Sequence, residues 1–359
     1  MITIGILGAG QLAQLLAHSA YQLGMKTICY AENLDQPAAR LSKIFVGSLD
    51  DPDALQLFAQ QCDVITVENE NISSKTLAIL EQTTPVYPKP NAITSAQDRL
   101  LEKKLFKSLQ IDTPSFAAVN SLTELEQALK DLGTPALLKI RRYGYDGKGQ
   151  FLLRDATHAK VAWQAIGSHA SILEGYISFD YEVSIIAARS KAGQCVFYPL
   201  IKNTHRDGIL RISESPINEP ALQQQAEAMI QKILEHFDYV GVLALELFVK
   251  DGKLIANELA PRVHNSGHLT LESCSCSQFE NQLRAVADLP LQQPKIYGYT
   301  QMLNILGTWP KLPPSLKANG HIYYYGKTPR PARKLGHITL FGAEPEIIKQ
   351  DSDAIRKLL

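Results

Sequence analysis

The stretch Gly241–Arg262 reads G-V-L-A-L-E-L-F-V-K-D-G-K-L-I-A-N-E-L-A-P-R, with two apolar runs on either side of Lys250-Asp251-Gly252. Apolar runs separated by a short turn sequence that contains glycine predict a β-hairpin. The length of the hairpin loop matters, because a shift of one residue in register turns the side chains of a strand to the opposite face. The loop therefore decides whether Glu246 and Glu258 share a face.

A turn of only Asp251 and Gly252 would place the two glutamates on opposite faces. A three-residue loop with Gly252 in the left-handed conformation separates the side chains better. One face then carries an almost wholly apolar set: Leu243, Leu245, Leu247, Val249, Ile255 and Leu259. The other face carries Ala244, Glu246, Phe248, Leu254, Ala256 and Glu258. We therefore predict the three-residue loop, with both carboxylates on one face and Asn257 as a polar residue on the apolar face.

Two carboxylates on neighbouring strands of one face repel each other. At about 4 Å and an effective dielectric constant of about 20, the repulsion is about 4 kcal/mol. Hard oxygen ligands of this kind suit Mg²⁺ that also bridges phosphates. The alternatives are two solvated acids, or an ion pair with Arg262. The favoured interpretation is that Glu246 and Glu258 hold a magnesium ion.

A glycine-rich segment, Arg141–Gln150, lies between two predicted strands, Ala136–Ile140 and Phe151–Arg154. It joins a strand to a strand, whereas a Walker loop joins a strand to a helix. Three glycines beside Lys148 make a mobile loop rich in amide groups that can close over phosphates, although many glycine-rich hairpin loops have no such role. Lys139 ends the apolar strand and would be costly there unless an anion paired with it. The segment is a candidate phosphate lid.

At the N-terminus, a predicted strand, Thr3–Leu7, precedes Gly8-x-Gly10-x-x-Ala13 and a helical pattern, and Glu32 follows the next strand, Lys26–Ala31. This spacing fits the fingerprint of a dinucleotide-binding fold. The same geometry serves another phosphorylated ligand, or only the close packing of a strand and a helix. From this motif alone, a nicotinamide-dependent oxidoreductase stays open.

The order of predicted elements indicates an α/β N-terminal part followed by an α+β remainder. A helix over Asp53–Gln61 and a strand over Val64–Val67 extend the first two strands into a βαβ series, which is typical of a parallel sheet covered by helices. The proline-rich stretch Thr84–Pro90 ends this part. Residues 95–130 have a helical pattern, and further along the chain strands alternate with one long helix, Pro220–Phe237.

Composition excludes some classes of function. The 359 residues include 36 basic and 36 acidic side chains, so the formal net charge is zero, whereas nucleic-acid and membrane-surface binders usually carry a basic excess. The first 25 residues lack charged side chains, but glutamines and glycines interrupt them and no basic region precedes them. The five scattered cysteines are typical of reduced thiols. We expect a cytoplasmic protein with no nucleic-acid or membrane partner.

Further motifs cover nearly the whole chain. They are G-I-L-G-A-G-Q-L (Gly5–Leu12), V-E-N-E-N (Val67–Asn71), D-R-L (Asp98–Leu100), G-Y-D-G-K-G-Q (Gly144–Gln150), F-Y-P-L (Phe197–Leu200), H-R-D-G-I-L-R (His205–Arg211), N-E-L-A-P-R-V-H-N-S-G-H (Asn257–His268) and R-K-L-G-H (Arg333–His337). Taken together, they resemble the ATP-grasp superfamily and, within it, the 5-(carboxyamino)imidazole ribonucleotide synthase (PurK) family. The motif at Asn257–His268 is highly specific. Most other ATP-grasp enzymes carry lysine where this chain has Arg99, and the similarity to PurK includes that departure.

The resemblance implies an ATP-grasp fold in four parts. These are a Rossmann-like parallel-sheet domain (1–94), a small lid domain with the glycine-rich loop (95–172), a larger antiparallel-sheet catalytic domain (173–289) and a small C-terminal subdomain packed on it (290–359). The implied activity is the carboxylation of the amine of 5-aminoimidazole ribonucleotide by bicarbonate, through carboxyphosphate, in purine biosynthesis. The implied cofactors are ATP and Mg²⁺, and the implied assembly is a homodimer.

The resemblance also implies roles for individual residues. Those implied to bind ATP are Arg99, Lys139, Gly144, Tyr145, Asp146, Gly147, Lys148, Gly149, Gln150, Glu174, Gly175, Tyr176, Ile177, Glu182, His205, Asn257 and Glu258. Those implied to bind the ribonucleotide are Gly10, Gln11, Glu70, Tyr145, Asp146, Arg262, Arg333 and Lys334. Arg262 and His264 would handle bicarbonate and its phosphorylated product, and either Asp146 or phosphate would accept the amine proton. Glu246 and Glu258 would bind Mg²⁺, in agreement with the hairpin argument.

Three rival functions stay open: another ATP-grasp carboxylate–amine ligase, an NAD(P)-dependent oxidoreductase, and a nucleotide sensor without catalysis. A zinc site is not expected at His264 and His268. Although the two histidines are four positions apart, Asn265-Ser266-Gly267 favours a loop over a helix, and no glutamate follows His264.

Overall fold

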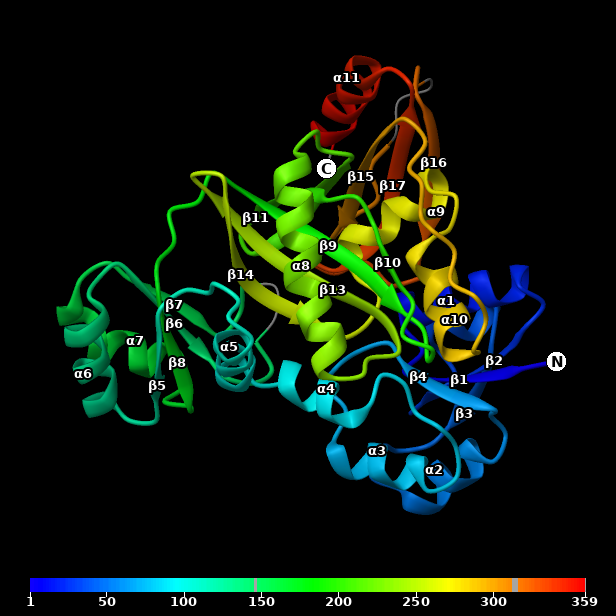
Figure 1. Ribbon diagram of the computed structural model, residues 1–359, viewed down its shortest axis with the longest axis horizontal. Coiled ribbons are helices and arrows are strands. Elements are labelled where there is room, and N and C mark those ends of the chain that lie inside the picture. The colour runs from blue at the N-terminus through cyan, green and yellow to red at the C-terminus, as the bar shows by residue number, and fades with distance from the viewer. Residues whose placement is uncertain (145–146, 312–315, 359) are drawn as a thin grey trace.

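Three β-sheets organise the chain in the computed structural model, which describes residues 1–144, 147–311 and 316–358 (Figure 1). The first sheet belongs to the N-terminal domain and the second to the lid, and the third runs through the rest of the chain. The fold is therefore α/β in its N-terminal part and α+β beyond it, as predicted.

The N-terminal sheet is parallel, with the strand order β3-β2-β1-β4. Its strands are β1 (Thr3–Leu7), β2 (Lys26–Ala31), β3 (Lys43–Val46) and β4 (Val64–Val67). Its helices are α1 (Gln11–Gln22), the 3₁₀ helix η1 (Pro37–Arg40), α2 (Pro52–Ala59), α3 (Ser74–Glu81) and α4 (Pro90–Ala96). The predicted bounds of β1, β2 and β4 are confirmed. The helix expected over Asp53–Gln61 begins earlier, because Asp51 accepts hydrogen bonds from the amides of Asp53 and Ala54 and caps it.

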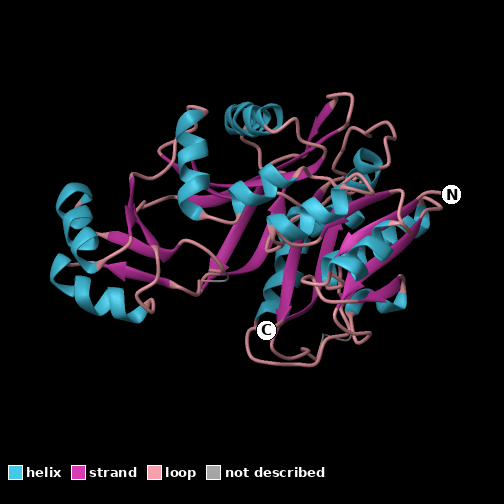
Figure 2. Cartoon of the chain, turned by 90° about the horizontal axis from the view of Figure 1, so that it is seen from below, coloured by secondary structure: helices cyan, strands magenta, loops and turns pink. Residues whose placement is uncertain are grey.

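The lid contains an antiparallel sheet with the order β5-β8-β6-β7, which lies at one end of the molecule (Figures 1 and 2). Its elements are β5 (Phe116–Val119), α6 (Leu122–Leu132), β6 (Ala136–Ile140), β7 (Gln150–Leu153), η2 (Ala156–His158), α7 (Ala159–Ala165) and β8 (Ser171–Gly175). The preceding helix, α5 (Arg99–Ser108), packs through Leu105 and Phe106 in the core of the third sheet. The expectation of helix across residues 95–130 was wrong, since β5 separates α5 from α6. We keep the four-domain division as a proposal, and its boundary after residue 172 falls inside β8.

The third sheet has nine strands in the order β14-β13-β9-β11-β12-β15-β17-β16, with β10 beside β9. Its strands are β9 (Tyr181–Arg189), β10 (Cys195–Phe197), β11 (Ile201–Arg206), β12 (Ile209–Ser215), β13 (Gly241–Lys250), β14 (Lys253–Ala260), β15 (Tyr299–Leu306), β16 (Asn319–Tyr324) and β17 (Lys334–Gly342). Its helices are α8 (Pro220–His236), η3 (Asn265–Leu269), α9 (Thr270–Ser273), α10 (Gln278–Val286) and α11 (Pro345–Arg356). The C-terminal strands β15, β16 and β17 continue the same sheet as the hairpin, because β15 pairs with β12.

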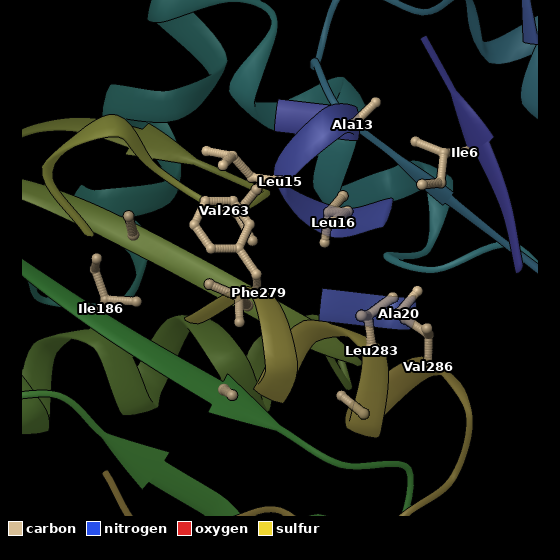
Figure 3. Packing of buried hydrophobic residues seen from close by; sticks show 14 of the residues in the cluster. Ile6, Ala13, Leu15, Leu16, Ala20, Ile186, Val263, Phe279, Leu283 and Val286 are labelled. Carbon is tan, nitrogen blue, oxygen red and sulfur yellow. The ribbon is translucent and has the colours of Figure 1, made fainter. Parts of the chain in front are cut away.

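A shared hydrophobic core joins the N-terminal domain to the third sheet. In Figure 3, Leu15 and Leu16 of α1 lie close to Phe279 and Leu283 of α10, and all four side chains are buried. Buried apolar packing of this kind holds the two parts in a defined orientation. Within the described part of the chain, no helix combines the length and the apolar character needed to cross a membrane.

The hairpin at Gly241–Arg262 forms, but its predicted three-residue loop was wrong. Lys250 pairs with Lys253, so the turn consists of Asp251 and Gly252, which have φ angles of 50° and 70°. Positive φ at both central positions defines a type I′ turn, whose twist matches that of the strands. In a regular hairpin with this two-residue turn, the side chains of Glu246 and Glu258 would lie on opposite faces. A β-bulge between them adds one residue, Asn257, so that Glu246 and Glu258 lie directly opposite each other.

The bulge also corrects the predicted faces of β14. Leu254 and Ala256 pack in the same buried cluster as Leu247 and Val249, whereas Ile255 pairs with Phe248 on the other face. The prediction that the two carboxylates lie next to each other on one face is therefore confirmed. The register predicted between these carboxylates and the turn was wrong.

Candidate active site

A cavity of about 520 Å³ lies where the N-terminal domain, the lid and the third sheet meet. All three parts contribute side chains to its wall. The predicted site residues that line it are Gln11, Glu70, Arg99, Lys139, Gly144, Gly147, Gln150, Glu182, His205, Glu246, Asn257, Glu258, Arg262, His264 and Lys334. The fold thus brings into one place residues that are more than 300 positions apart in the chain.

The paired glutamates have different cationic neighbours. Oε1 of Glu246 lies 3.1 Å from Nε2 of His264, and Oε2 of Glu258 lies 3.1 Å from Nη1 of Arg99. Burial raises the pKa of Glu246, but His264, His205 and Arg262 outweigh that effect and hold the pKa below its ordinary value. Glu246 is therefore a carboxylate at neutral pH and can act as a metal ligand.

The donor set at the hairpin fits Mg²⁺. The two opposed carboxylates supply hard oxygen atoms, and in nucleotide enzymes Mg²⁺ uses one or two protein carboxylates together with substrate phosphates. Among the described residues no cluster of three or more His, Cys, Asp and Glu side chains could hold a metal by itself. Because two carboxylates leave coordination positions open for phosphate oxygens, the pair suits an ion that binds together with a phosphate ligand.

Lys139 has the anionic partner that its place in an apolar strand requires. Its Nζ donates to Oε2 of Glu174 at 2.7 Å, and Nζ of Lys103 lies 3.8 Å from the other carboxylate oxygen. Burial raises the pKa of Glu174, but Lys103 and Lys139 outweigh it and lower the pKa to about 2. The side chain of Glu174 is thus committed to holding Lys139 at the wall of the cavity.

Another part of the cavity wall is apolar. Phe179 and Phe248 stack with their ring centroids 4.6 Å apart, and Leu137 and Leu210 line the same cavity. Sequence analysis did not assign these residues to the site. A signal existed only for Phe248, because the predicted hairpin placed it on the face of Glu246. An apolar, aromatic wall of this kind suits a planar ring.

Beside that apolar wall, where Glu182 is the cross-strand neighbour of Phe248, Glu182 and His205 form an ion pair through Nδ1 of the imidazole. Burial lowers the pKa of His205, but the hydrogen bond to Glu182 and the charges of Glu246 and Glu182 outweigh it, so the pKa lies above 6.5. The stabilisation from the charged pair is complete below the unfolded-state pKa of about 6.5 and is lost as the pH rises through the folded-state pKa.

We expect NMR titration of the His205 ring to give a pKa above 6.5 and the Glu182→Gln variant to lower it. The cause is the loss of the carboxylate that favours the charged imidazole, while burial stays the same. The exposed variant Lys160→Gln, on α7, is the control and should leave the titration unchanged. A pKa at or below 6.5 in the unmodified chain would contradict this assignment.

The glycine motif at the N-terminus does not leave its amides open for a dinucleotide. The carboxylate of Glu68, at the end of β4, accepts hydrogen bonds from the amides of Gly10 and Ala13 at 2.7 and 2.9 Å. A Cβ atom at Gly8 would lie 2.3 Å from the Glu68 side chain, so glycine is required there for this contact. Since a protein carboxylate occupies the N-terminus of α1, the pyrophosphate of a nicotinamide cofactor could not bind in its usual place.

Arg262 joins the third sheet to the N-terminal domain. Its Nε donates to Oε2 of Glu70 at 2.5 Å, and its Nη1 donates to the carbonyl of Val263 at 3.2 Å. Burial opposes ionisation of Glu70, but the charge of Arg262 outweighs it and lowers the pKa of Glu70. The guanidinium is therefore held in one orientation at the cavity wall, next to His264 and the paired glutamates.

Comparison with known proteins agrees with this geometry. Three family models match successive parts of the chain: a ribonucleotide synthetase preATP-grasp domain (residues 1–97), an ATP-grasp domain (104–279) and a phosphoribosylaminoimidazole carboxylase C-terminal domain (300–351). The N5-carboxyaminoimidazole ribonucleotide synthase of Pseudomonas aeruginosa is 44% identical over 338 residues, which cover 94% of each chain. The chain belongs to the N5-carboxyaminoimidazole ribonucleotide synthase family. It is an ATP-grasp ligase.

Solved structures of this family share the whole fold. The crystal structure of the Thermus thermophilus synthetase has a TM-score of 0.94 at 42% identity, covering 99% of this chain and 98% of that one. The synthase of Aspergillus clavatus, solved in complex with ADP and 5-aminoimidazole ribonucleotide, has a TM-score of 0.90 at 27% identity, covering 99% of each chain.

Some residues that the synthase family implied for the site do not line the cavity: Gly10, Lys148, Gly149, Glu174, Gly175, Tyr176, Ile177 and Arg333. The amide of Gly10 is bound to Glu68, and Arg333 donates to the carbonyl of Thr328. Tyr145 and Asp146 lie outside the described residues, so their roles stay predictions.

The synthase fold also shows side chains that sequence reasoning missed. Lys327 donates to Oε1 of Gln11 and lies over the ring of Tyr325, and burial together with the charge of Arg333 lowers the pKa of Lys327 to about 8. The residues after His264 form the 3₁₀ helix η3 where a loop was expected, and His268 is buried against Phe279. No pattern in the sequence around Lys327 or His268 indicated these contacts.

Proposed function

We propose that this cavity carries out the reaction of its family, the ATP-dependent carboxylation of the amine of 5-aminoimidazole ribonucleotide in purine biosynthesis. Bicarbonate is the source of the carboxyl group, carboxyphosphate is the intermediate, and the products are 5-(carboxyamino)imidazole ribonucleotide, ADP and phosphate. The observation that carries the proposal is the central place of Glu246 and Glu258, which contact His264 on one side and Arg99 on the other. ATP phosphates bound on the Arg99 side can therefore meet bicarbonate bound on the His264 side.

ATP fits the part of the cavity between the aromatic wall and the lid. Its adenine would lie at Phe179 and Phe248, and its ribose near Glu182. Arg99 and Lys139 would bind the phosphates, and Gly144–Gln150 would cover them. Lys139 is fixed by Glu174, so the cation is in place before the nucleotide arrives. Preorganised charge of this kind stabilises a transferring phosphoryl group without reorganisation during the reaction.

Mg²⁺ would be held by Glu246 and Glu258 and would neutralise charge on the phosphate oxygens when bound. The remaining steps depend on side chains of this chain. Arg262 and His264 would orient bicarbonate so that its oxygen attacks the γ-phosphorus. Because Glu70 holds the guanidinium, bicarbonate meets donors that are already oriented, and such positioning accounts for about 7–11 kcal/mol in favourable cases.

The ribonucleotide would lie against Gln11 and Glu70, with Lys334 near its phosphate. Its amine then attacks the carboxyl carbon of carboxyphosphate, phosphate leaves, and the amine proton passes to Asp146 or to the departing phosphate. Carboxyphosphate is short-lived in water, so the lid must exclude solvent until the amine has reacted. We further propose that the enzyme acts in the cytoplasm as a homodimer, without nucleic-acid or membrane partners, on the strength of its family and its balanced charge.

The proposal is tested by measuring ADP release together with transfer of ¹³C from labelled bicarbonate, followed by NMR of the carbamate carbon. We expect full turnover only when ATP, Mg²⁺, bicarbonate and 5-aminoimidazole ribonucleotide are all present. A folded preparation that releases no ADP with all four would overturn the proposal. Turnover with a different amine, and none with this ribonucleotide, would favour another ATP-grasp ligase.

A further inference from the structure

The two backbone groups that flank Glu258 are not satisfied by the partner strand alone. The bulge between β13 and β14 inserts Asn257 beside Glu258, at the point where the ladder changes register. β14 is the edge strand of the third sheet, so backbone groups on its outer side, among them the carbonyl of Asn257 and the amide of Leu259, have no partner in a neighbouring strand. Such groups are costly when buried unless something else binds them, so the groups that bind them help to hold this stretch of β14 in its bulged conformation.

One turn of α5 supplies the missing partners. Nζ of Lys103 donates to the carbonyl of Asn257, and Oε1 of Glu102 accepts from the amide of Leu259 at 2.6 Å. Arg99 lies three and four positions earlier, hence on the same helical face, and binds the Glu258 carboxylate itself at 3.1 Å. The peptide group before Glu258, the peptide group after it and its side chain are thus all held by one helix.

The cost of this arrangement argues that it does more than hold the fold together. Glu102 and Lys103 are each only 1% exposed, and Oε2 of Glu102 has no hydrogen-bond partner among the described residues. Burying two ionisable side chains is expensive, and apolar residues of similar volume often stabilise a protein more. Helix α5 already packs through Leu100, Leu105 and Phe106. The packing of α5 therefore does not require Glu102 and Lys103, and their hydrogen bonds to β14 explain why two polar side chains are buried here.

We propose that Glu102 and Lys103 are positioning residues that hold the bulge in β14 and thereby keep Glu258 opposite Glu246. This inference rests on the proposed function, in which that pair binds the metal of the nucleotide complex. Without the bulge, the regular register of the hairpin would turn the side chain of Glu258 to the opposite face of the ribbon. The two residues act on the metal through Glu258. Neither lines the cavity itself, although Glu102 lines a small hollow beside it that Arg99 and Glu258 also line.

Lys103 has a second contact that extends the same role. It lies 3.8 Å from Glu174, the carboxylate that binds Lys139. The ammonium of Lys103 therefore stands between the backbone of Asn257 and the group that fixes a phosphate-binding lysine. Its loss is expected to disturb both sides of the cavity, whereas loss of Glu102 is expected to disturb only Glu258.

The test is the affinity of the chain for Mn²⁺ in the presence of saturating ADP, measured by electron paramagnetic resonance, beside the affinity for ADP without metal. We expect Glu102→Leu and Lys103→Met to weaken Mn²⁺ binding about tenfold or more, as loss of an outer-shell partner does at other metal sites. Glu102→Gln keeps an oxygen that can accept from Leu259, and it should restore Mn²⁺ affinity to within about threefold of the unmodified chain. Binding of metal-free ADP should change little in Glu102→Leu.

Two matched variants on α5 separate positioning from general damage. Lys104→Met removes a charge at the exposed neighbouring position, and Leu105→Val removes packing at a buried one. Leu105→Val should lower the Tm while leaving Mn²⁺ affinity unchanged, and Lys104→Met should change neither. If Glu102→Leu does not fold, Lys103→Met and Glu102→Gln still decide the matter.

Two results would overturn the proposal. Normal Mn²⁺ affinity in both Glu102→Leu and Lys103→Met, measured well below their Tm, would show that the bulge does not depend on these two side chains. Failure of the unmodified chain to bind Mn²⁺ with ADP would remove the metal site itself, and with it the proposed function. The first result leaves the function standing, so the two failures are distinguishable.

Discussion

Replacing Glu246 with glutamine is expected to lower kcat about a thousandfold. Glu246 is a partly buried carboxylate whose pKa is held low by His264, His205 and Arg262, and it faces Glu258 across the hairpin. The glutamine has nearly the same shape but lacks the charge that would balance a divalent cation. Weakening the charge stabilisation of a transferring phosphoryl group by about 4 kcal/mol corresponds to about three powers of ten in rate.

The measurement is the rate of ADP release at saturating substrates, repeated over a range of Mg²⁺ concentrations. Glu246→Asp keeps the charge on a shorter side chain, so we expect part of the rate to return at high Mg²⁺. Glu126→Gln, at an exposed position of α6, is the matched control and should behave like the unmodified chain. A kcat for Glu246→Gln within tenfold of the control, with the same Mg²⁺ dependence, would rule out the metal role.

The hairpin shows why a correct prediction about the site could rest on a wrong register. Apolar patterning of β13 and β14 revealed two strands and a glutamate on each, because burial imposes that pattern on the sequence. The bulge at Asn257 contacts Lys103 of α5, which is more than 150 positions away in the chain. No local pattern carries that information, so a longer loop was the simplest way to place the two acids on one face.

The interactions of Lys139 and of the first glycine motif have the same explanation. Sequence reasoning showed that Lys139 needed an anion, but a nucleotide phosphate and a protein carboxylate satisfy that need equally well, and the partner is Glu174 of another strand. Likewise, Gly8 and Gly10 indicated a close approach to the N-terminus of α1, and the group that approaches is Glu68. Residue spacing predicts that a partner is required, whereas only the tertiary fold decides which one is present.

Replacing Arg262 is expected to affect the step that uses bicarbonate. We expect Arg262→Met to lower kcat/KM for bicarbonate about 100- to 1000-fold, the usual effect of removing an oriented donor to a developing oxyanion. Arg262→Lys should also be impaired, since an ammonium cannot keep the contacts to Glu70 and Val263 that orient the guanidinium. The affinity for ATP should change much less, because the predicted nucleotide contacts lie elsewhere in the cavity.

Loss of Arg262 would also leave Glu70 as a partly buried carboxylate without its partner, and that alone costs stability. The double variant Glu70→Gln with Arg262→Met removes both charges and separates the two effects. We expect it to regain Tm relative to Arg262→Met, with no gain in kcat/KM for bicarbonate. If activity returned together with stability, Arg262 would serve only to join the third sheet to the N-terminal domain. Stability without activity, at ribonucleotide concentrations at which the Glu70→Gln single variant is active, would instead place the guanidinium at the reacting bicarbonate, where His264 and Glu246 are its neighbours.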